Sequence, residues 1–385
     1  MERERVAIVG AGILGLAHAW SAAERGHQVT VFERCPRAWG ASIRNFGMIW
    51  PIGQPAGEWH ELALESRERW TVVGRLAGLW VNPCGSIHLA HRADEWAVLE
   101  EFATYSKQSG HACRLLNRAA VLDKTPAANG DNLLGGLFSP TELGINPRAA
   151  LPRIAEWLRE AFSVRLNFGT AANRVSVNDS SGGVAIETSR GTDEKFDRVI
   201  VCGGTDCQSL FPDAIAAAKL RLCKLLMLKT ARQPAGWHIG PHLASGLTLR
   251  HYRNFEACIS LSALRQRIAL ESPQLDKYGV HVMAAQNDAG EVILGDSHEY
   301  GPDISPFDKA EIDELILHEL KKIACLKDWS ITERWHGFYV KCAEGAPIFQ
   351  AEPLPRVHLC TGAGGGGMTL SFGIAEANWR RWSQQ

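Results

Sequence analysis

Three glycines near the start of the chain have the spacing of a dinucleotide-binding turn. In VAIVGAGILG (6–15), an apolar stretch of strand type runs directly into Gly10, Gly12 and Gly15. A helix-forming stretch, a second short apolar strand and then Glu33 follow. This order of strand, turn, helix, strand and acid makes the GxGxxG match specific, because the glycines alone would be a weak signal.

Each residue of this turn has a physical task. Gly10 allows the tight turn, Gly12 lets the backbone approach a diphosphate, and Gly15 lets the helix pack on the strand. The diphosphate would then lie on the free amides of a helix that begins near Ile13. Glu33 can accept hydrogen bonds from ribose hydroxyls and would repel a 2′-phosphate, which favours FAD or NAD over NADP. A glycine-rich turn without a ligand is the alternative.

Two further loops have the composition of segments that lie along a ligand. GASIRNFGMI (40–49) combines small residues with a hydroxyl, an arginine and an amide, although a plain surface loop is the alternative. TGAGGGGMT (361–369) precedes a helix that we expect over 370–382. These loops must be positioned by the elements that surround them.

The composition describes an ordinary globular protein and excludes several classes. The chain has 385 residues, which predicts two or three substructures, and its net charge of −1 indicates neither nucleic acid nor a membrane surface as a partner. No apolar run approaches the ~20 residues of a membrane span, and no signal peptide is evident, so we expect a cytoplasmic protein. The 10 cysteines are scattered, which predicts neither a disulfide framework nor a metal site.

The apolar pattern predicts an α/β start and a later antiparallel part. Apolar residues at helical spacing predict helices over 58–77, 94–107, 148–161 and 307–324. Short apolar stretches predict strands over 79–81, 86–89, 164–168, 172–177, 184–187, 196–204 and 357–360. A further group predicts an antiparallel sheet from 219–230, 246–251, 257–262 and 280–285.

The order of these motifs resembles the D-amino acid oxidase superfamily of FAD-dependent amine oxidoreductases, which includes glycine oxidase, sarcosine oxidase and D-amino acid dehydrogenase. The resemblance covers nearly the whole chain. It is carried by Gly10, Gly12 and Gly15, by Glu33 and Arg34, by the loop of Ser42, Asn45 and Gly47, and by 199–204, 337–348 and 361–370. The implied fold is α/β combined with α+β, in which a Rossmann-like FAD-binding domain is built from discontinuous segments. That domain comprises 1–78, 140–215 and 326–385, with an antiparallel-sheet substrate-binding domain over 79–139 and 216–325.

The resemblance also assigns residues to FAD. They are Gly10, Ala11, Gly12, Ile13, Leu14, Gly15, Glu33, Arg34, Ser42, Arg44, Asn45, Phe46, Gly47, Arg174, Val175, Cys202, Gly203, Gly204, Gly337, Gly364, Gly365, Gly366, Gly367, Met368 and Thr369. In the family, the strand around Arg174 passes the adenine, and the late glycine loop would stabilise negative charge on a reduced flavin. Sarcosine oxidases tether the flavin through a cysteine where this chain has Gly337. We therefore expect non-covalent FAD, with a link through the nearby Cys342 as the alternative.

The substrate side departs from the family pattern. Amino acid oxidases of this superfamily commonly carry an arginine that forks onto the substrate carboxylate, and Tyr339 stands at that position here. Tyrosine and lysine offer single donors, so we expect Arg44, Tyr252, Tyr339 and Lys341 to orient another anion. Arg250, His251 and Arg253 are further candidate donors. A subgroup with a similar Ser-x-Arg-Asn-Phe-Gly loop is associated with phosphonate catabolism, which suggests a 2-aminoethylphosphonate-type substrate.

The expected reaction is the oxidation of a C–N bond. A neutral amine would pass hydride from its α-carbon to flavin N5, and the imine would hydrolyse to an aldehyde or ketone plus ammonia or an amine. Oxygen or an electron carrier would then accept the electrons. The alternatives are a D-amino acid, glycine or sarcosine oxidase or dehydrogenase, an NAD-dependent dehydrogenase, and a flavin-binding protein without turnover. The sequence carries no signal for an oligomeric state.

Overall fold

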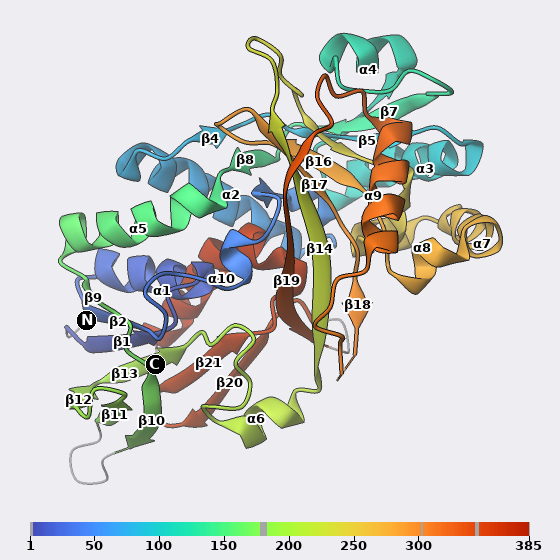
Figure 1. Cartoon of the computed structure of the whole chain (residues 1–385). Coiled ribbons are helices and arrows are strands. Elements are labelled where there is room, and N and C mark those ends of the chain that lie inside the picture. The colour runs from blue at the N-terminus through green and yellow to red at the C-terminus, as the bar shows by residue number, and fades with distance from the viewer. Residues whose placement is uncertain (1–2, 178–182, 302, 343–345, 385) are drawn as a thin grey trace.

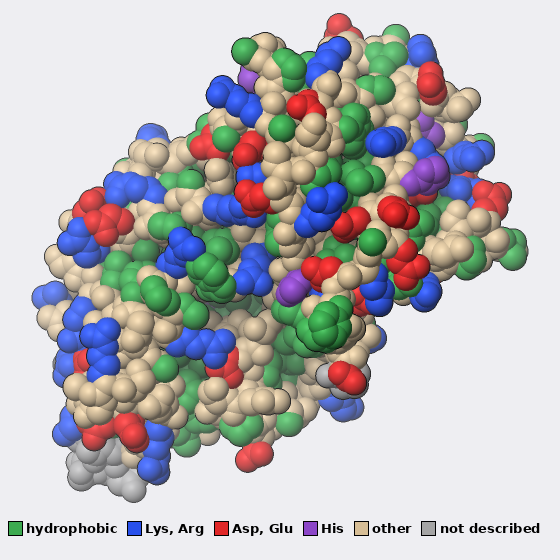
Figure 2. All heavy atoms as spheres, viewed as in Figure 1, with side chains coloured by type: hydrophobic (Ala, Val, Ile, Leu, Met, Phe, Trp, Pro, Cys, Tyr) green, Lys and Arg blue, Asp and Glu red, His purple; other side chains and the backbone are tan. Residues whose placement is uncertain are grey.

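Two large sheets organise the protein (Figure 1). The computed structural model describes residues 3–177, 183–301, 303–342 and 346–384. Residues 343–345, which belong to the segment 337–348 of the resemblance, lie outside the described residues, as do 1–2, 178–182 and 385 of the expected FAD-binding domain. Figure 2 shows basic and acidic side chains interspersed over the visible face, in keeping with the net charge of −1.

The first sheet takes its strands from three distant parts of the chain. Its strands, in chain order, are β1 (Arg5–Val9), β2 (Gln28–Glu33), β9 (Arg165–Phe168), β13 (Arg198–Val201), β20 (Phe349–Leu354) and β21 (Val357–Thr361). Their spatial order is β20-β21-β13-β1-β2-β9, with all pairs parallel except β20 with β21. The central β1 is a continuous apolar run because both of its faces are covered, as is usual in parallel sheets. The expected assembly of a Rossmann-like sheet from N-terminal, central and C-terminal segments is confirmed.

Helices cover one face of this sheet and a small sheet covers the other. The helices are α1 (Ile13–Glu24), α2 (Glu58–Ala77), α5 (Pro147–Phe162) and α10 (Gly367–Trp382). Trp20 of α1 lies at the centre of their shared core, with its ring 5.3 Å from Trp157 and 5.3 Å from Phe372. The opposite face carries β10 (Ala172–Val177), β11 (Val184–Thr188), β12 (Asp193–Phe196) and α6 (Pro212–Ala217). The helices expected over 58–77, 148–161 and 370–382 are therefore present within a few residues of their predicted bounds.

The second sheet is mostly antiparallel. Its strands are β5 (Ser86–Ala90), β6 (Arg114–Asn117), β7 (Gly135–Ser139), β14 (Leu220–Arg232), β15 (His242–Ala244), β16 (Met283–Gln286), β17 (Glu291–Gly295), β18 (Glu299–Tyr300) and β19 (Ile331–Cys342). The long strands β14 and β19 pair along most of their length and run side by side through the middle of Figure 1. Because β19 is bonded to β14, it joins this sheet although 326–385 was assigned to the FAD-binding domain. The division into domains stays a prediction.

Helices and short turns enclose the second sheet. The helices are α3 (Ala93–Ser109), α4 (Arg118–Lys124), α7 (Leu261–Glu271), α8 (Pro273–Lys277) and α9 (Ala310–Ile323). The strands predicted over 246–251 and 257–262 are wrong, because these segments form the 3₁₀ turns η3 (Gly246–Arg250) and η4 (Arg253–Ala257) and the start of α7. Their buried Leu249 and Phe255 belong to the main core of this part of the chain. Short apolar runs do not reveal by periodicity alone whether they are strands or helical turns.

A small sheet connects the two parts. It contains β3 (Met48–Ile49), β8 (Leu143–Ile145) and β4 (Val81–Asn82), and the 3₁₀ turns η1 (Ala41–Ile43) and η2 (Pro51–Gly53) flank β3. A further 3₁₀ turn, η5 (Gly364–Gly366), leads into α10. Among the described residues, no helix combines the length and apolar character needed to cross a bilayer.

Candidate active site

The N-terminal glycine turn is shaped by close backbone contacts. Helix α1 begins at Ile13, as expected. Gly10 has φ +102°, and a Cβ there would lie 2.4 Å from the carbonyl oxygen of Cys202. A Cβ on Gly15 would lie 1.9 Å from the carbonyl oxygen of Gly10. Only glycine fits at these two positions, so the turn can hold β1, α1 and the end of β13 together.

Glu33 and Ser42 are fixed beside this turn. Glu33 ends β2, and its two carboxylate oxygens accept hydrogen bonds from the backbone amides of Ala11 and Cys35, each at 2.9 Å. The Ser42 hydroxyl accepts a hydrogen bond of 3.0 Å from the amide of Ile13, the first residue of α1. The carboxylate at the end of β2 and the start of α1 therefore face the same space, which is the arrangement that ribose and diphosphate require.

An elongated cavity of about 530 Å³ runs past this turn. The predicted cofactor residues that line it are Gly10, Gly12, Ile13, Leu14, Gly15, Glu33, Arg34, Ser42, Arg44, Cys202, Gly203, Gly204, Gly364 and Gly367. Asn173, in the strand that the resemblance places along the adenine, also lines it, as does Asp206, which sequence reasoning missed. Asp206 forms an ion pair with Arg34 at 2.7 Å, and no motif in the sequence connects these two residues.

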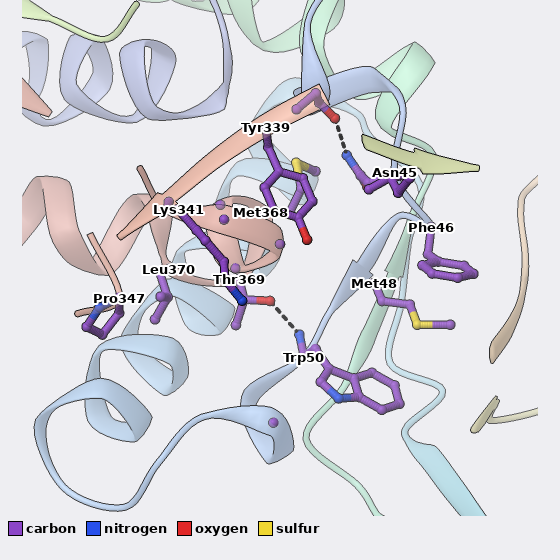
Figure 3. Close-up of a pocket in the computed structure, with 18 of the residues that line it drawn as sticks. Asn45, Phe46, Met48, Trp50, Tyr339, Lys341, Pro347, Met368, Thr369 and Leu370 are labelled. Carbon is purple, nitrogen blue, oxygen red and sulfur yellow. Dashed lines mark hydrogen bonds between the residues drawn. The ribbon is translucent and has the colours of Figure 1, made fainter. Parts of the chain in front are cut away.

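A second cavity of about 280 Å³ continues from the first (Figure 3). The predicted residues that line it are Ile13, Ser42, Arg44, Asn45, Phe46, Tyr252, Gly337, Tyr339, Lys341, Gly364, Gly365, Gly366, Gly367, Met368 and Thr369. Both cavities share Ser42, Arg44 and Gly364, so they form one bent space. Cys342, the alternative flavin tether, also lines the second cavity.

Four residues assigned to FAD do not line either cavity. Ala11 is buried in the core beneath the turn, and Gly47 packs so closely on β8 that a Cβ would lie 1.9 Å from the carbonyl oxygen of Ile145. Arg174 points to solvent from β10, whereas the side chain of Val175 is buried in the core on the other face of the first sheet. These four residues therefore occupy structural or solvent-exposed positions.

The described residues fit FAD. The glycine turn and Glu33 match the diphosphate and the ribose at one end of the bent space. At the other end, no side chain caps the start of η5 or α10, so their first amides are open to an electron-rich group. A Cβ on Gly364 would lie 3.1 Å from Cβ of Lys341, which shows how closely this glycine loop approaches β19.

Tyr339 and Lys341 project from β19 into the second cavity (Figure 3). They are two positions apart, so their side chains leave the strand on the same face. The Lys341 ammonium donates a hydrogen bond of 3.1 Å to the hydroxyl of Tyr300. Burial lowers the pKa of Lys341 and raises the pKa of Tyr339 and of Tyr252. At neutral pH both tyrosines are therefore uncharged hydrogen-bond donors.

Basic side chains outnumber acidic ones among the described lining residues of the second cavity. Arg44, Arg253 and Lys341 line it, and Asp296 is the one carboxyl group among its described lining residues. Burial raises the pKa of Asp296 well above its usual value, which weakens its negative charge. Arg253 also pairs with Glu256 at 3.8 Å, whereas Arg250 pairs with Asp276 and does not line the cavity.

Sequence reasoning missed three residues of this wall. His281, Asp296 and His298 line the second cavity together with the candidate donor His251. The loops before β16 and after β17 carry the three missed residues, and no short motif links them. Only a prediction of how these loops pair could have found them.

Comparisons with known proteins agree with this architecture. An opine oxidase subunit of Rhizobium meliloti is 22% identical over 373 residues, which cover 91% of this chain and 86% of that protein. Glycine oxidase from Geobacillus kaustophilus has a TM-score of 0.75 at 18% identity, and the match covers 98% of this chain and 94% of that enzyme. L-proline dehydrogenase from P. horikoshii has a TM-score of 0.75 at 19% identity, and the match covers 99% of this chain and 94% of that protein.

The structural likenesses establish the fold. The family model described as FAD dependent oxidoreductase (DAO) matches residues 5–378, which is nearly the whole chain. This match selects FAD, and the alternative of an NAD-dependent dehydrogenase is set aside. With its two-part cavity and its glycine loops, the chain belongs to the DAO family of FAD-dependent oxidoreductases.

Proposed function

We propose that the protein oxidises the C–N bond of a small amine that carries an anionic group, with a 2-aminoethylphosphonate-type compound as the substrate. The observation that carries this proposal is the charge of the second cavity. Arg44, Arg253 and Lys341 line it, against a single carboxyl group among the described lining residues. An anionic substrate would be attracted to such a space.

The kind of donor favours a tetrahedral anion over a carboxylate. A planar carboxylate is best held by the paired donors of one guanidinium, and β19 carries Tyr339 where the family commonly has that arginine. Tyr339 and Lys341 each offer a donor from β19, and Arg44 offers others from the end of η1. Donors that converge from separate elements suit the three oxygens of a phosphonate.

The residues of this chain would hold the cofactor and orient the amine. Glu33 would bind the ribose, the amides of 10–15 the diphosphate, and the loop 362–367 would stabilise negative charge at the far end. FAD, when bound, supplies the hydride acceptor for C–N oxidation. Lys341 and Tyr339 would fix the anionic group so that the α-carbon and the neutral amine face the cofactor. Phe46, Met48 and Trp50 line the same cavity and would exclude water from the reacting carbon (Figure 3).

The test is a substrate panel on the purified FAD-containing protein. We expect 2-aminoethylphosphonate or its N-methyl form to bleach the flavin absorbance under anaerobic conditions faster than glycine, sarcosine, D-alanine or proline. An amine of the same length without the phosphonate is the matched control and should react slowly. A clear preference for a simple amino acid would contradict the proposed substrate and support an amino acid oxidase or dehydrogenase.

A further inference from the structure

Three histidines and one aspartate meet on the wall of the second cavity. The possible ligand nitrogens of His251, His281 and His298 all lie within 4.8 Å of one another. Asp296 lies beside them, with Oδ1 3.4 Å from Nε2 of His281 and Oδ2 3.6 Å from Nε2 of His298. We name these four residues the His-Asp cluster. All four line the cavity, and none of them has a role in the proposed function above.

Backbone pairing holds the His-Asp cluster together. His281 and Asp296 exchange two backbone hydrogen bonds, of 3.2 and 2.9 Å, so they face each other like a pair in an antiparallel ladder. The amide of His298 donates a further bond of 2.8 Å to the carbonyl of Tyr278. His251 follows η3, and its ring centroid lies 3.9 Å from that of His281 and 4.5 Å from that of His298.

Several polar atoms of the cluster are buried and have no hydrogen-bond partner among the described residues. They are both ring nitrogens of His281 and Oδ1 of Asp296. The side chains are 4% exposed for His281 and 8% exposed for Asp296, so bulk water does not replace the missing partners. Buried polar groups are normally satisfied, and unsatisfied ones that line a cavity are available to bind a ligand there.

The hydrogen bond of His298 shows what kind of ligand is missing. Nδ1 of His298 lies 3.2 Å from the carbonyl oxygen of Gly279, which can only accept, so Nδ1 carries the proton. The lone pair of Nε2 is then left facing the Asp296 carboxyl group. That lone pair is available to bind a metal ion. A histidine whose second nitrogen donates to a backbone carbonyl is also the usual arrangement of a metal ligand.

We propose that the His-Asp cluster binds a divalent transition metal ion such as Zn²⁺, with His251, His281 and His298 as ligands and Asp296 beside them. Imidazole ligands suit zinc and its first-row neighbours. Ligand atoms around one zinc ion lie roughly 3.4 Å apart, given metal–nitrogen bonds of about 2.0–2.1 Å. The histidine nitrogens lie within 4.8 Å of one another, and the rings of His281 and His298, which are stacked at 13° to each other, must rotate to direct their nitrogens at one ion.

The ion would lie where it can bind the substrate, a consequence that rests on the proposed function. A divalent ion held by three neutral imidazoles keeps its positive charge, and its open fourth position on the cavity side would admit an anionic oxygen. The ring of His298 lies 6.3 Å from that of Tyr339, so a phosphonate oxygen on the metal would remain beside the proposed donors of β19. The metal would anchor the anion and take no part in electron transfer.

The test measures the metal directly, independently of turnover. FAD-containing protein is stripped with a chelator, incubated with ZnCl₂, separated from free metal, and analysed for zinc per flavin. We expect one zinc per FAD, and we expect His298→Gln and His251→Gln to weaken zinc binding by on the order of 100-fold. His318→Ala, which removes an exposed histidine of α9, should bind zinc like the unaltered chain. The flavin spectrum of each variant shows whether it is folded, and His281→Gln replaces any variant that loses FAD.

The same samples separate this inference from the proposed function. Absence of zinc above background, or equal zinc in the cluster variants and in His318→Ala, would overturn the metal site even if aminophosphonates are oxidised. Stoichiometric zinc in a protein that does not oxidise aminophosphonates would support the metal site and overturn the proposed substrate. If both hold, stripping the zinc should raise KM for the aminophosphonate about tenfold, while KM for an amine without an anionic group stays the same. An unchanged KM would overturn the anchoring role.

Discussion

Replacement of Lys341 by methionine tests the anion-binding role of β19. Methionine keeps the length and the apolar stem of the side chain but removes the ammonium, which lines the second cavity and donates to Tyr300. We expect the variant to fold and to bind FAD, since Lys341 is not part of a large core cluster among the described residues. Its defect should concern the anionic part of the substrate.

The size of the defect follows from the burial of Lys341. A hydrogen bond with a charged partner contributes about 1.5–3 kcal/mol, and the partly exposed position of Lys341 places it toward the lower part of that range. About 2 kcal/mol corresponds to a roughly 30-fold lower kcat/KM for 2-aminoethylphosphonate. The loss should fall mainly on KM, because the contact is present in both the bound substrate and the transition state.

The assay compares two substrates and two variants. Steady-state kinetics are measured for 2-aminoethylphosphonate and for an amine of equal length without the phosphonate, with Lys341→Met and with Lys327→Met as an exposed control. We expect the large loss only for the anionic substrate and only in Lys341→Met. Equal losses on both substrates would refute the reasoning and assign Lys341 to the cofactor, since its Cβ also packs against Gly364 of the glycine loop.

Two further predictions concern the cofactor and the core. Gly15→Ala should yield protein without flavin absorbance, because its Cβ would lie 1.9 Å from the Gly10 carbonyl oxygen. Gly301→Ala, outside both cavities and with no atom closer than 3.8 Å to its Cβ, should keep FAD; full flavin content in Gly15→Ala would contradict this. Burial lowers the pKa of His88 to about 3. As the pH falls below the ordinary histidine pKa of about 6.5, His88 takes up a proton in the unfolded chain but stays neutral in the folded protein. The free energy of unfolding therefore falls between about pH 6.5 and pH 3. Between about pH 7 and pH 5 the free energy of unfolding should fall by up to about 2 kcal/mol more in the unaltered protein than in His88→Leu. Urea titration at each pH measures this difference. Equal pH dependence in the two proteins would contradict the prediction.

Local geometry explains what could be read from the sequence. The N-terminal turn was predictable because steric limits on Gly10 and Gly15 act between neighbours in the chain, and Glu33 follows at the end of the adjacent strand. The late glycine loop was predictable for the same reason, since it leads directly into α10. These local signals were sufficient to identify the family, the cofactor and the Rossmann-like sheet.

The tertiary structure decided the chemistry of the substrate side. Arg250 was as good a candidate as Lys341 by residue type, but Asp276 holds it outside the cavity, and such a pairing has no local signal. The histidines and the aspartate of the cluster come together only because the loops around His281 and Asp296 pair with each other. Apolar periodicity reports which face of an element is buried, whereas the convergence of polar side chains depends on long-range strand and loop pairing, which no single stretch of this sequence encodes.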